Sequence, residues 1–122
     1  MPADARDAAH LWDMLDAARE AVGYVGGLTF SAFERDRRTR RAVERCVEIV
    51  GEAARKVSRD FEAEHPEVPW QKIVAMRHVL AHEYGEVQDE ILWRVATVHL
   101  PALVAQIEPL VPELPRGDEG NG

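Results

Sequence analysis

Four side chains that could take part in chemistry lie within the short segment 77–84: Arg77, His78, His82 and Tyr84. Histidine can accept or donate a proton near neutral pH, because its unperturbed pKa is about 6.5. Arginine stays charged and can donate two parallel hydrogen bonds to a phosphate or a carboxylate. The segment could therefore move a proton beside a bound anion. The structural alternative is that Arg77 pairs with a carboxylate, the histidines lie on the surface and Tyr84 packs with its hydroxyl in water.

Two other kinds of chemistry find less support. His78 and His82 are four residues apart, so a helix could present both imidazoles to one metal ion, but no third ligand stands at a defined spacing. A zinc-protease pattern begins at His82-Glu83 but has Glu86 where a second histidine is required. Cys46 falls on an apolar stripe, which indicates a buried structural thiol rather than a nucleophile. We therefore predict a site with no metal and no cofactor.

The periodicity of apolar residues predicts the helices that must position this segment. Apolar residues recur every three or four positions over 7–24, over 37–58, and again from Gln88 or Asp89 onward. A helix predicted over 70–84 carries the four side chains, with Pro69 at its first turn and a stop at Gly85. Pro101 lies inside the last helix and should kink or divide it. The predicted apolar stripe of that last helix is Leu92, Val95, Val98 or His99, Leu103 and Ile107.

Shorter segments connect these helices. Ser31 and Glu34 stand at capping-box spacing, which predicts a short helix there. The stretch 58–69 is predicted to be a connection with one helical turn near Phe61. The tail 112–122 has prolines, glycines and few apolar residues, so we expect it to be disordered. No segment alternates like a strand, and we predict one all-α domain over 1–111, a bundle of four main helices plus short connecting helices.

Composition limits the class of protein. The chain has 122 residues, of which 46% are hydrophobic and 30% charged, as in an ordinary globular domain. With one cysteine, no membrane-length apolar run and no signal-peptide core, we expect a cytoplasmic protein. The net charge of −7 argues against a uniformly basic nucleic-acid binder. Six arginines over 35–45 still form a positive patch, which is either a solvated helix face or a surface for RNA or a protein partner: Arg35, Arg37, Arg38, Arg40, Arg41 and Arg45.

The segment 77–84 also resembles a known motif. Arg77, four further residues, then His82 and Tyr84 are similar to the R-x4-H-x-Y signature of HepT-like toxins in the HEPN superfamily. Other segments resemble that family in the same order. They are a first helix at 11–18, a connector at 28–30 with Phe33, a long-helix core at 49–54, and a turn at 65–70 before the motif helix. With the final helix they cover 11–110, and this ordered set makes the resemblance specific.

The resemblance implies an all-α homodimer with ribonuclease activity, acting as the toxin of a toxin–antitoxin system. It also implies a partner, an antitoxin of the minimal nucleotidyltransferase type, which can transfer AMP from ATP to Tyr84 and silence the toxin. The sequence departs from the family at two places. His78 stands where the family usually has asparagine or aspartate, and we expect this polar residue to support the site. Gly85-Glu86-Val87 stands where the family often has an aromatic residue and a glycine.

On this resemblance Arg77 and His82 would be the catalytic pair. In cleavage without a metal, the 2′-hydroxyl of RNA attacks the adjacent phosphate, His82 moves protons and Arg77 stabilises charge on the phosphate oxygens. On a continuous helix the two side chains point about 140° apart. Either the helix ends before His82, or the site combines residues from two subunits. Two other functions stay open: a catalytically inactive partner of a nucleotidyltransferase, and a metal-dependent hydrolase using His78 and His82.

Overall fold

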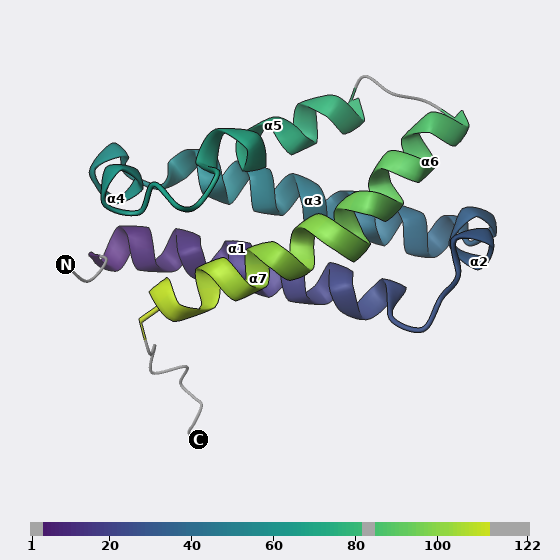
Figure 1. Ribbon diagram of the computed structural model, residues 1–122, viewed down its shortest axis with the longest axis horizontal. Coiled ribbons are helices and arrows are strands. Elements are labelled where there is room, and N and C mark those ends of the chain that lie inside the picture. The colour runs from purple at the N-terminus through teal and green to yellow at the C-terminus, as the bar shows by residue number, and fades with distance from the viewer. Residues whose placement is uncertain (1–3, 82–84, 113–122) are drawn as a thin grey trace.

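The computed structural model describes residues 4–81 and 85–112, and the regular structure in these residues is entirely helical. In chain order the elements are α1 (Ala5–Val25), α2 (Phe30–Arg35), α3 (Arg37–Lys56), α4 (Arg59–Glu64), α5 (Trp70–Ala81), α6 (Gly85–Arg94), the π-helix η1 (Val95–His99), α7 (Leu100–Ile107) and the 3-10 helix η2 (Glu108–Leu110). Helices α1 and α3 lie side by side, α5 packs on α3, and the run from α6 to α7 crosses over α1 (Figure 1). The predicted all-α bundle of four main helices with short connecting helices is confirmed.

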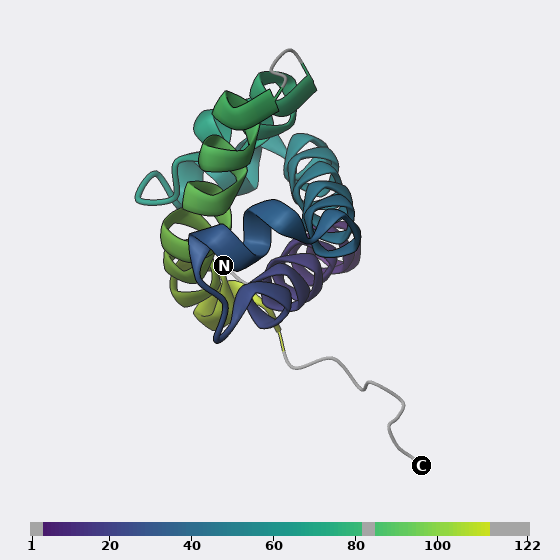
Figure 2. The ribbon, with the colours of Figure 1, turned by 90° about the vertical axis from the view of Figure 1, so that its right-hand side faces the viewer.

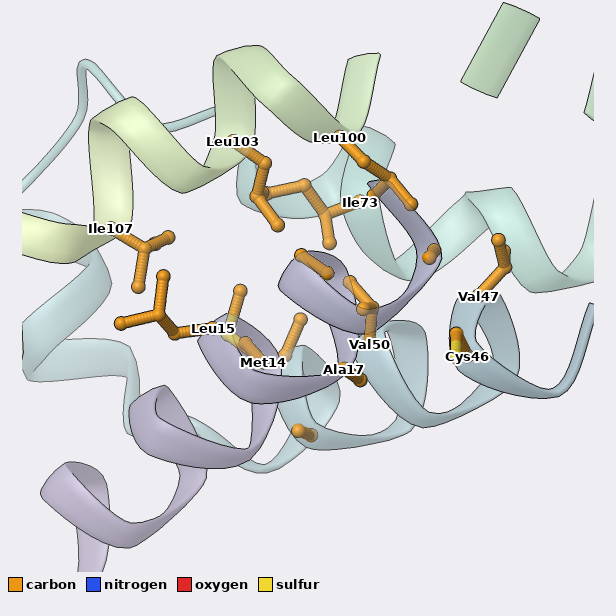
Figure 3. Packing of buried hydrophobic residues seen from close by; sticks show 14 of the residues in the cluster. Met14, Leu15, Ala17, Cys46, Val47, Val50, Ile73, Leu100, Leu103 and Ile107 are labelled. Atoms are coloured by element: carbon orange, nitrogen blue, oxygen red, sulfur yellow. The ribbon is translucent and has the colours of Figure 1, made fainter. Parts of the chain in front are cut away.

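The apolar faces of these helices meet in one core. Viewed from the end that carries α2, the helices surround a common centre (Figure 2). Met14 and Leu15 of α1 pack there with Val50 of α3, Ile73 of α5 and Leu103 of α7, and each is at most 2% exposed (Figure 3). Burial of this apolar area is the main force that fixes α5 against α3.

Side chains at the helix starts satisfy backbone N–H groups that the helices themselves leave unpaired. Thr29 caps α2, because its backbone is extended and its hydroxyl accepts a hydrogen bond from the Ala32 N–H at 3.1 Å. The predicted capping box over Ser31 and Glu34 is therefore wrong, since the cap lies two residues earlier. The side chains that cap the first four helices are those of Asp4, Thr29, Asp36 and Ser58.

Pro101 divides the last helix as predicted, and the division changes which residues face the core. Proline has no N–H to donate and its ring would clash with the carbonyl four residues back. The backbone widens into η1 just before it, and the Leu100 N–H bonds to the Val95 carbonyl five residues away. This wider turn leaves Val98 and His99 exposed and brings Leu100 into the core. The predicted stripe is right at Leu92, Val95, Leu103 and Ile107 and wrong at Val98 or His99.

Other predicted boundaries differ by a few residues. Helix α6 begins at Gly85, not at Gln88 or Asp89. The predicted last turn of the motif helix, 82–84, lies outside the described residues, as does the predicted disordered tail apart from Pro112. No helix within the described ranges is long and apolar enough to cross a membrane.

Asp7 is the one charged residue that is buried among those the structure describes, at 5% exposure. Its carboxylate accepts hydrogen bonds from the Ser58 N–H at 2.8 Å and the Ser58 hydroxyl at 2.7 Å. The same hydroxyl accepts a hydrogen bond from the Phe61 N–H at 3.1 Å and so caps α4. Asp7 therefore attaches the start of α4 to α1 and fixes the connection that leads into α5.

The Asp7→Ala protein should lose about 2–3 kcal/mol of unfolding free energy, because the charged acceptor of two hydrogen bonds is removed and the Ser58 N–H is left unpaired. Urea unfolding at neutral pH measures this loss. Asp13→Ala, an exposed carboxylate on the same helix, is the matched control and should change the unfolding free energy by less than about 0.5 kcal/mol. Equal stabilities of the two variants would contradict the assigned role.

Candidate functional site

Arg77 lies on the face of α5 that packs against α3, and its aliphatic stem crosses Gly51. A Cβ atom placed on Gly51 would stand 3.2 Å from the Cδ of Arg77 and 3.4 Å from its Cβ and Cγ. Real Cβ atoms seldom have contacts this short. Glycine inside a helix costs about 1 kcal/mol relative to alanine. Gly51 therefore makes α3 less stable as a helix, but it allows the stem of Arg77 to lie close against α3.

The charged end of Arg77 is only loosely held. Its Nη1 lies 3.6 Å from Oε1 of Glu52, beyond hydrogen-bonding distance, and 32% of the side chain is exposed. Its Nε is buried and has no hydrogen-bond partner among the described residues. A buried donor without a partner is costly. The exposed part of the guanidinium makes only the long contact with Glu52, so it can also contact an anion from solvent.

Glu52 gathers further positive charge next to Arg77. Its Oε2 lies 2.5 Å from Nη2 of Arg55 and 4.0 Å from Nζ of Lys56. The hydrogen bond from Arg55 lowers the pKa of Glu52 below its ordinary value, and the charges of Arg55, Arg77 and Lys56 lower it further. Glu52 is therefore ionised at neutral pH. Three cations share this one carboxylate, which leaves local positive charge in a chain whose net charge is −7.

The predicted site residues fall partly within the described chain. Arg77 is half-buried and His78, the next residue of α5, is exposed. His82 and Tyr84 lie outside the described residues, so their distances from Arg77 stay predictions. The same holds for the two solutions proposed for the catalytic pair, a helix that ends before His82 or a site shared between subunits.

The alternative in which His78 and His82 bind a metal depends on His82, which lies outside the described residues. Over 4–81 and 85–112, no three His, Cys, Asp or Glu side chains lie close enough together to hold a metal ion.

Two partners of Arg77 were not predicted from the sequence. Gly51 and Glu52 belong to a segment that resembles the family, and nothing in the sequence connects them to the segment 77–84. One signal was available, because a glycine in the interior of a helical pattern often marks the close approach of another backbone or side chain. No spacing rule in the sequence could say which residue approaches it.

The arginine patch over 35–45 is partly structural. The Nε of Arg40 pairs with Oδ1 of Asp89 at 3.4 Å, and its Nη1 donates to the Glu34 carbonyl. Arg40 therefore joins α3 to α6 and α2. Arg45 pairs with Glu48 at 3.2 Å on the surface of α3. The remaining arginines of the patch are exposed: Arg35, Arg37, Arg38 and Arg41.

Cys46 is buried at 3% exposure, as predicted from its place on the apolar stripe. Burial, followed by the nearby carboxylate of Glu20, raises the pKa of the thiol from 9.0 to about 11. The thiol donates to Oε1 of Glu20 at 3.6 Å. A neutral, buried thiol is a poor nucleophile, so Cys46 belongs to the core.

The raised pKa makes the reactivity of Cys46 testable. At pH 8 the folded protein should hold about 100-fold less thiolate than the unfolded chain, because the pKa lies two units higher. The rate of reaction with a thiol reagent should be at least that much lower than in urea. It should still rise about tenfold per pH unit between pH 8 and 10. Equal rates in the folded and unfolded chains would contradict the assigned burial.

Fold and site together define a class, a helical bundle in which an arginine lies between two helices with its charged end partly exposed. A family model described as ribonuclease HepT-like matches residues 14–110. The chain belongs to the HepT-like ribonuclease family, and the resemblance drawn from the R-x4-H-x-Y pattern is confirmed.

The names of three similar proteins agree with this family assignment. The chain is 30% identical to "Putative RNase MJ0127" of Methanocaldococcus jannaschii over 93% of each chain. It is 34% identical to "Probable ribonuclease HepT" of Thermococcus cleftensis, over 83% of this chain and 92% of the relative. It is 32% identical to "Putative RNase TTE0752" of Caldanaerobacter subterraneus, over 84% and 91%. No solved structure gives a significant match.

Because Gly51 contacts Arg77, a side chain added at Gly51 should lower activity while the protein keeps its fold. Gly51→Ala should change the unfolding free energy by no more than about 1 kcal/mol, because the gain in helix propensity offsets the crowding. It should lower the rate of RNA cleavage about 10-fold, because the new Cβ displaces Arg77 by a few tenths of an ångström. Gly23→Ala is the control, since a Cβ there meets nothing within 4 Å. Equal cleavage by the two variants would contradict the role of the contact.

Proposed function

We propose that this chain is the toxin of a toxin–antitoxin system, a homodimeric ribonuclease that cleaves RNA without a metal or a cofactor. Membership of the HepT-like ribonuclease family supports the class of reaction. The observation that carries the proposal is the placement of Arg77. Its stem is fixed on Gly51 while its guanidinium keeps an unused buried donor and partial access to solvent.

In the proposed reaction the 2′-oxygen of one nucleotide forms a bond to the adjacent phosphorus, and the bond from phosphorus to the 5′-oxygen breaks. A proton leaves the 2′-hydroxyl and a proton arrives at the 5′-oxygen, so the products carry a 2′,3′-cyclic phosphate and a 5′-hydroxyl. Only RNA has this nucleophile. The reaction needs proton transfer and positive charge at the non-bridging oxygens, and needs nothing that a metal must supply.

Arg77 supplies the positive charge in this proposal. A phosphate competes with Glu52 for the guanidinium, and the ion pair at 3.6 Å is loose enough to be exchanged. Charge stabilisation of this kind is commonly the largest single contribution to catalysis. His82 transfers the protons, and His78, exposed beside Arg77 on α5, supports the site as a second polar group.

The ribonuclease activity is regulated by a protein partner in this proposal. The partner is a minimal nucleotidyltransferase antitoxin that transfers AMP from ATP to the hydroxyl of Tyr84, and the pair acts in the cytoplasm. An AMP group two residues beyond His82 brings a negative phosphate and a bulky base towards the site. It would compete with RNA for Arg77 and repel substrate phosphates.

The purified chain should cleave RNA in EDTA, leaving 2′,3′-cyclic phosphate and 5′-hydroxyl ends. Arg77→Ala and His82→Ala should each lower the rate at least about 100-fold while the dimer survives, because each removes a group that acts in the transition state. Gel analysis of RNA fragments and mass spectrometry of their ends measure this.

Three results would count against this account. Loss of the dimer in either variant would make the residue structural. Activity that EDTA abolishes would favour the metal-dependent hydrolase. No cleavage by a folded dimer that carries no AMP on Tyr84 would favour the alternative function, a catalytically inactive partner of a nucleotidyltransferase.

The proposed modification predicts a mass gain of one AMP group on the peptide that contains Tyr84 when the chain is mixed with ATP and its antitoxin. RNA cleavage should fall in proportion to the modified fraction. The Tyr84→Phe protein should gain no mass, because it lacks the accepting hydroxyl. If that variant still gained the mass, the modification would lie elsewhere.

A further inference from the structure

A second feature of the α3–α5 interface lies outside the segment 77–84. The C-terminal end of α3, helix α4 and the N-terminal half of α5 enclose a groove of about 730 Å³. Three cationic side chains line it, one from each of these helices: Arg55 of α3, Arg59 of α4 and Lys72 of α5. Glu62 is the one carboxylate in the lining. The groove therefore carries an excess of positive charge in an acidic chain.

The groove leads to the candidate site. Val74 of α5 and Arg55 of α3 both line it. One helical turn beyond Val74 along α5 stands Arg77, and one turn before Arg55 along α3 stands Gly51. These two residues are in contact, so both walls of the groove converge on the stem of Arg77. Arg55 and Arg77 also flank the two oxygens of Glu52.

The remaining lining suits the uncharged parts of a nucleotide. The groove's apolar lining includes Pro66 and Pro69, which are exposed, and the buried residues Val68 and Trp70. The indole N–H of Trp70 donates to the His65 carbonyl at 2.9 Å, which fixes the ring in place. Sites for single-stranded nucleic acids combine cations that follow the phosphates with apolar surface for sugars and bases.

We propose that this groove binds the RNA strand next to the cleaved phosphate, with Arg59 and Lys72 as contacts to its backbone phosphates. The inference rests on the proposed function, whose substrate path it specifies. Both side chains are exposed and no ion pair is found for either among the described residues. Arg55 contributes less, because Glu52 already binds it. The exposed arginines at 37–41 lie at the opposite end of α3, away from the groove.

The test compares two double variants with the same change of charge, Arg59→Gln/Lys72→Gln in the groove and Arg37→Gln/Arg38→Gln in the arginine patch. The binding probe is a short single-stranded RNA with 2′-O-methyl groups, which has no free nucleophile and cannot be cleaved in the proposed way. Binding is measured over a series of salt concentrations. Cleavage of the unmodified RNA is measured in parallel, and circular dichroism checks the fold.

The Arg59→Gln/Lys72→Gln double variant should bind the probe with a Kd about 10-fold higher than that of the parent. It should also lower the slope of log Kd against log salt by about 1.4, because two phosphate contacts are lost from a single strand. The KM of this variant for cleavage should rise in parallel. The Arg37→Gln/Arg38→Gln variant should bind the probe like the parent. The proposed RNA groove would be wrong if the Arg59→Gln/Lys72→Gln protein bound the probe like the parent, or if both double variants weakened binding equally. Cleavage of RNA by the parent would in that case still uphold the proposed function. A folded parent chain that neither binds nor cleaves RNA would overturn both.

Discussion

The candidate site depends on one steric constraint, the absence of a side chain at Gly51. Helix α3 is otherwise an amphipathic helix rich in arginine and glutamate, and a Cβ at this position would press on three carbons of Arg77. Glycine lets the arginine stem lie flat on α3, which brings the guanidinium to Glu52 and leaves its Nε buried. The stem of a long, flexible side chain thereby acquires a defined position, and its charged end lies beside Glu52 with partial access to solvent.

The rest of the bundle keeps this contact in place. The core shared by α1, α3, α5 and α7 sets the distance between α3 and α5. At one end, Asp7 holds the start of α4 through Ser58 and so fixes the connection into α5. At the other end, Arg40 joins α3 to α6, and Trp93 of α6 packs on Phe33 of α2 with ring centroids 5.1 Å apart. Hydrogen bonds and an ion pair at the two ends, with apolar packing between them, hold α3 in place beneath Arg77.

The sequence predicted what depends on local pattern. Apolar periodicity predicted the main helices, and Pro101 predicted the division of the last one. The spacing of Arg77, His82 and Tyr84, together with the ordered set of segments over 11–110, predicted the family. What it missed depends on contacts between distant segments. The π-helix moves Leu100 into the core, although an α-helical stripe predicts Val98 or His99 there. The pairing of Arg77 with Gly51 and Glu52 joins residues about 25 positions apart, and no periodicity encodes the partner of an interior glycine.

The central claim is that Arg77, seated on Gly51, supplies the positive charge at the scissile phosphate. Chemical rescue tests it most directly: single-turnover RNA cleavage by Arg77→Ala protein, with and without free guanidinium ion at concentrations too low to unfold the chain. Truncation leaves space above Gly51 that a guanidinium ion can enter. The account predicts that cleavage by the variant is nearly lost and partly recovers with added guanidinium, while the parent does not respond. A folded Arg77→Ala protein that cleaves RNA at the parental rate would contradict it.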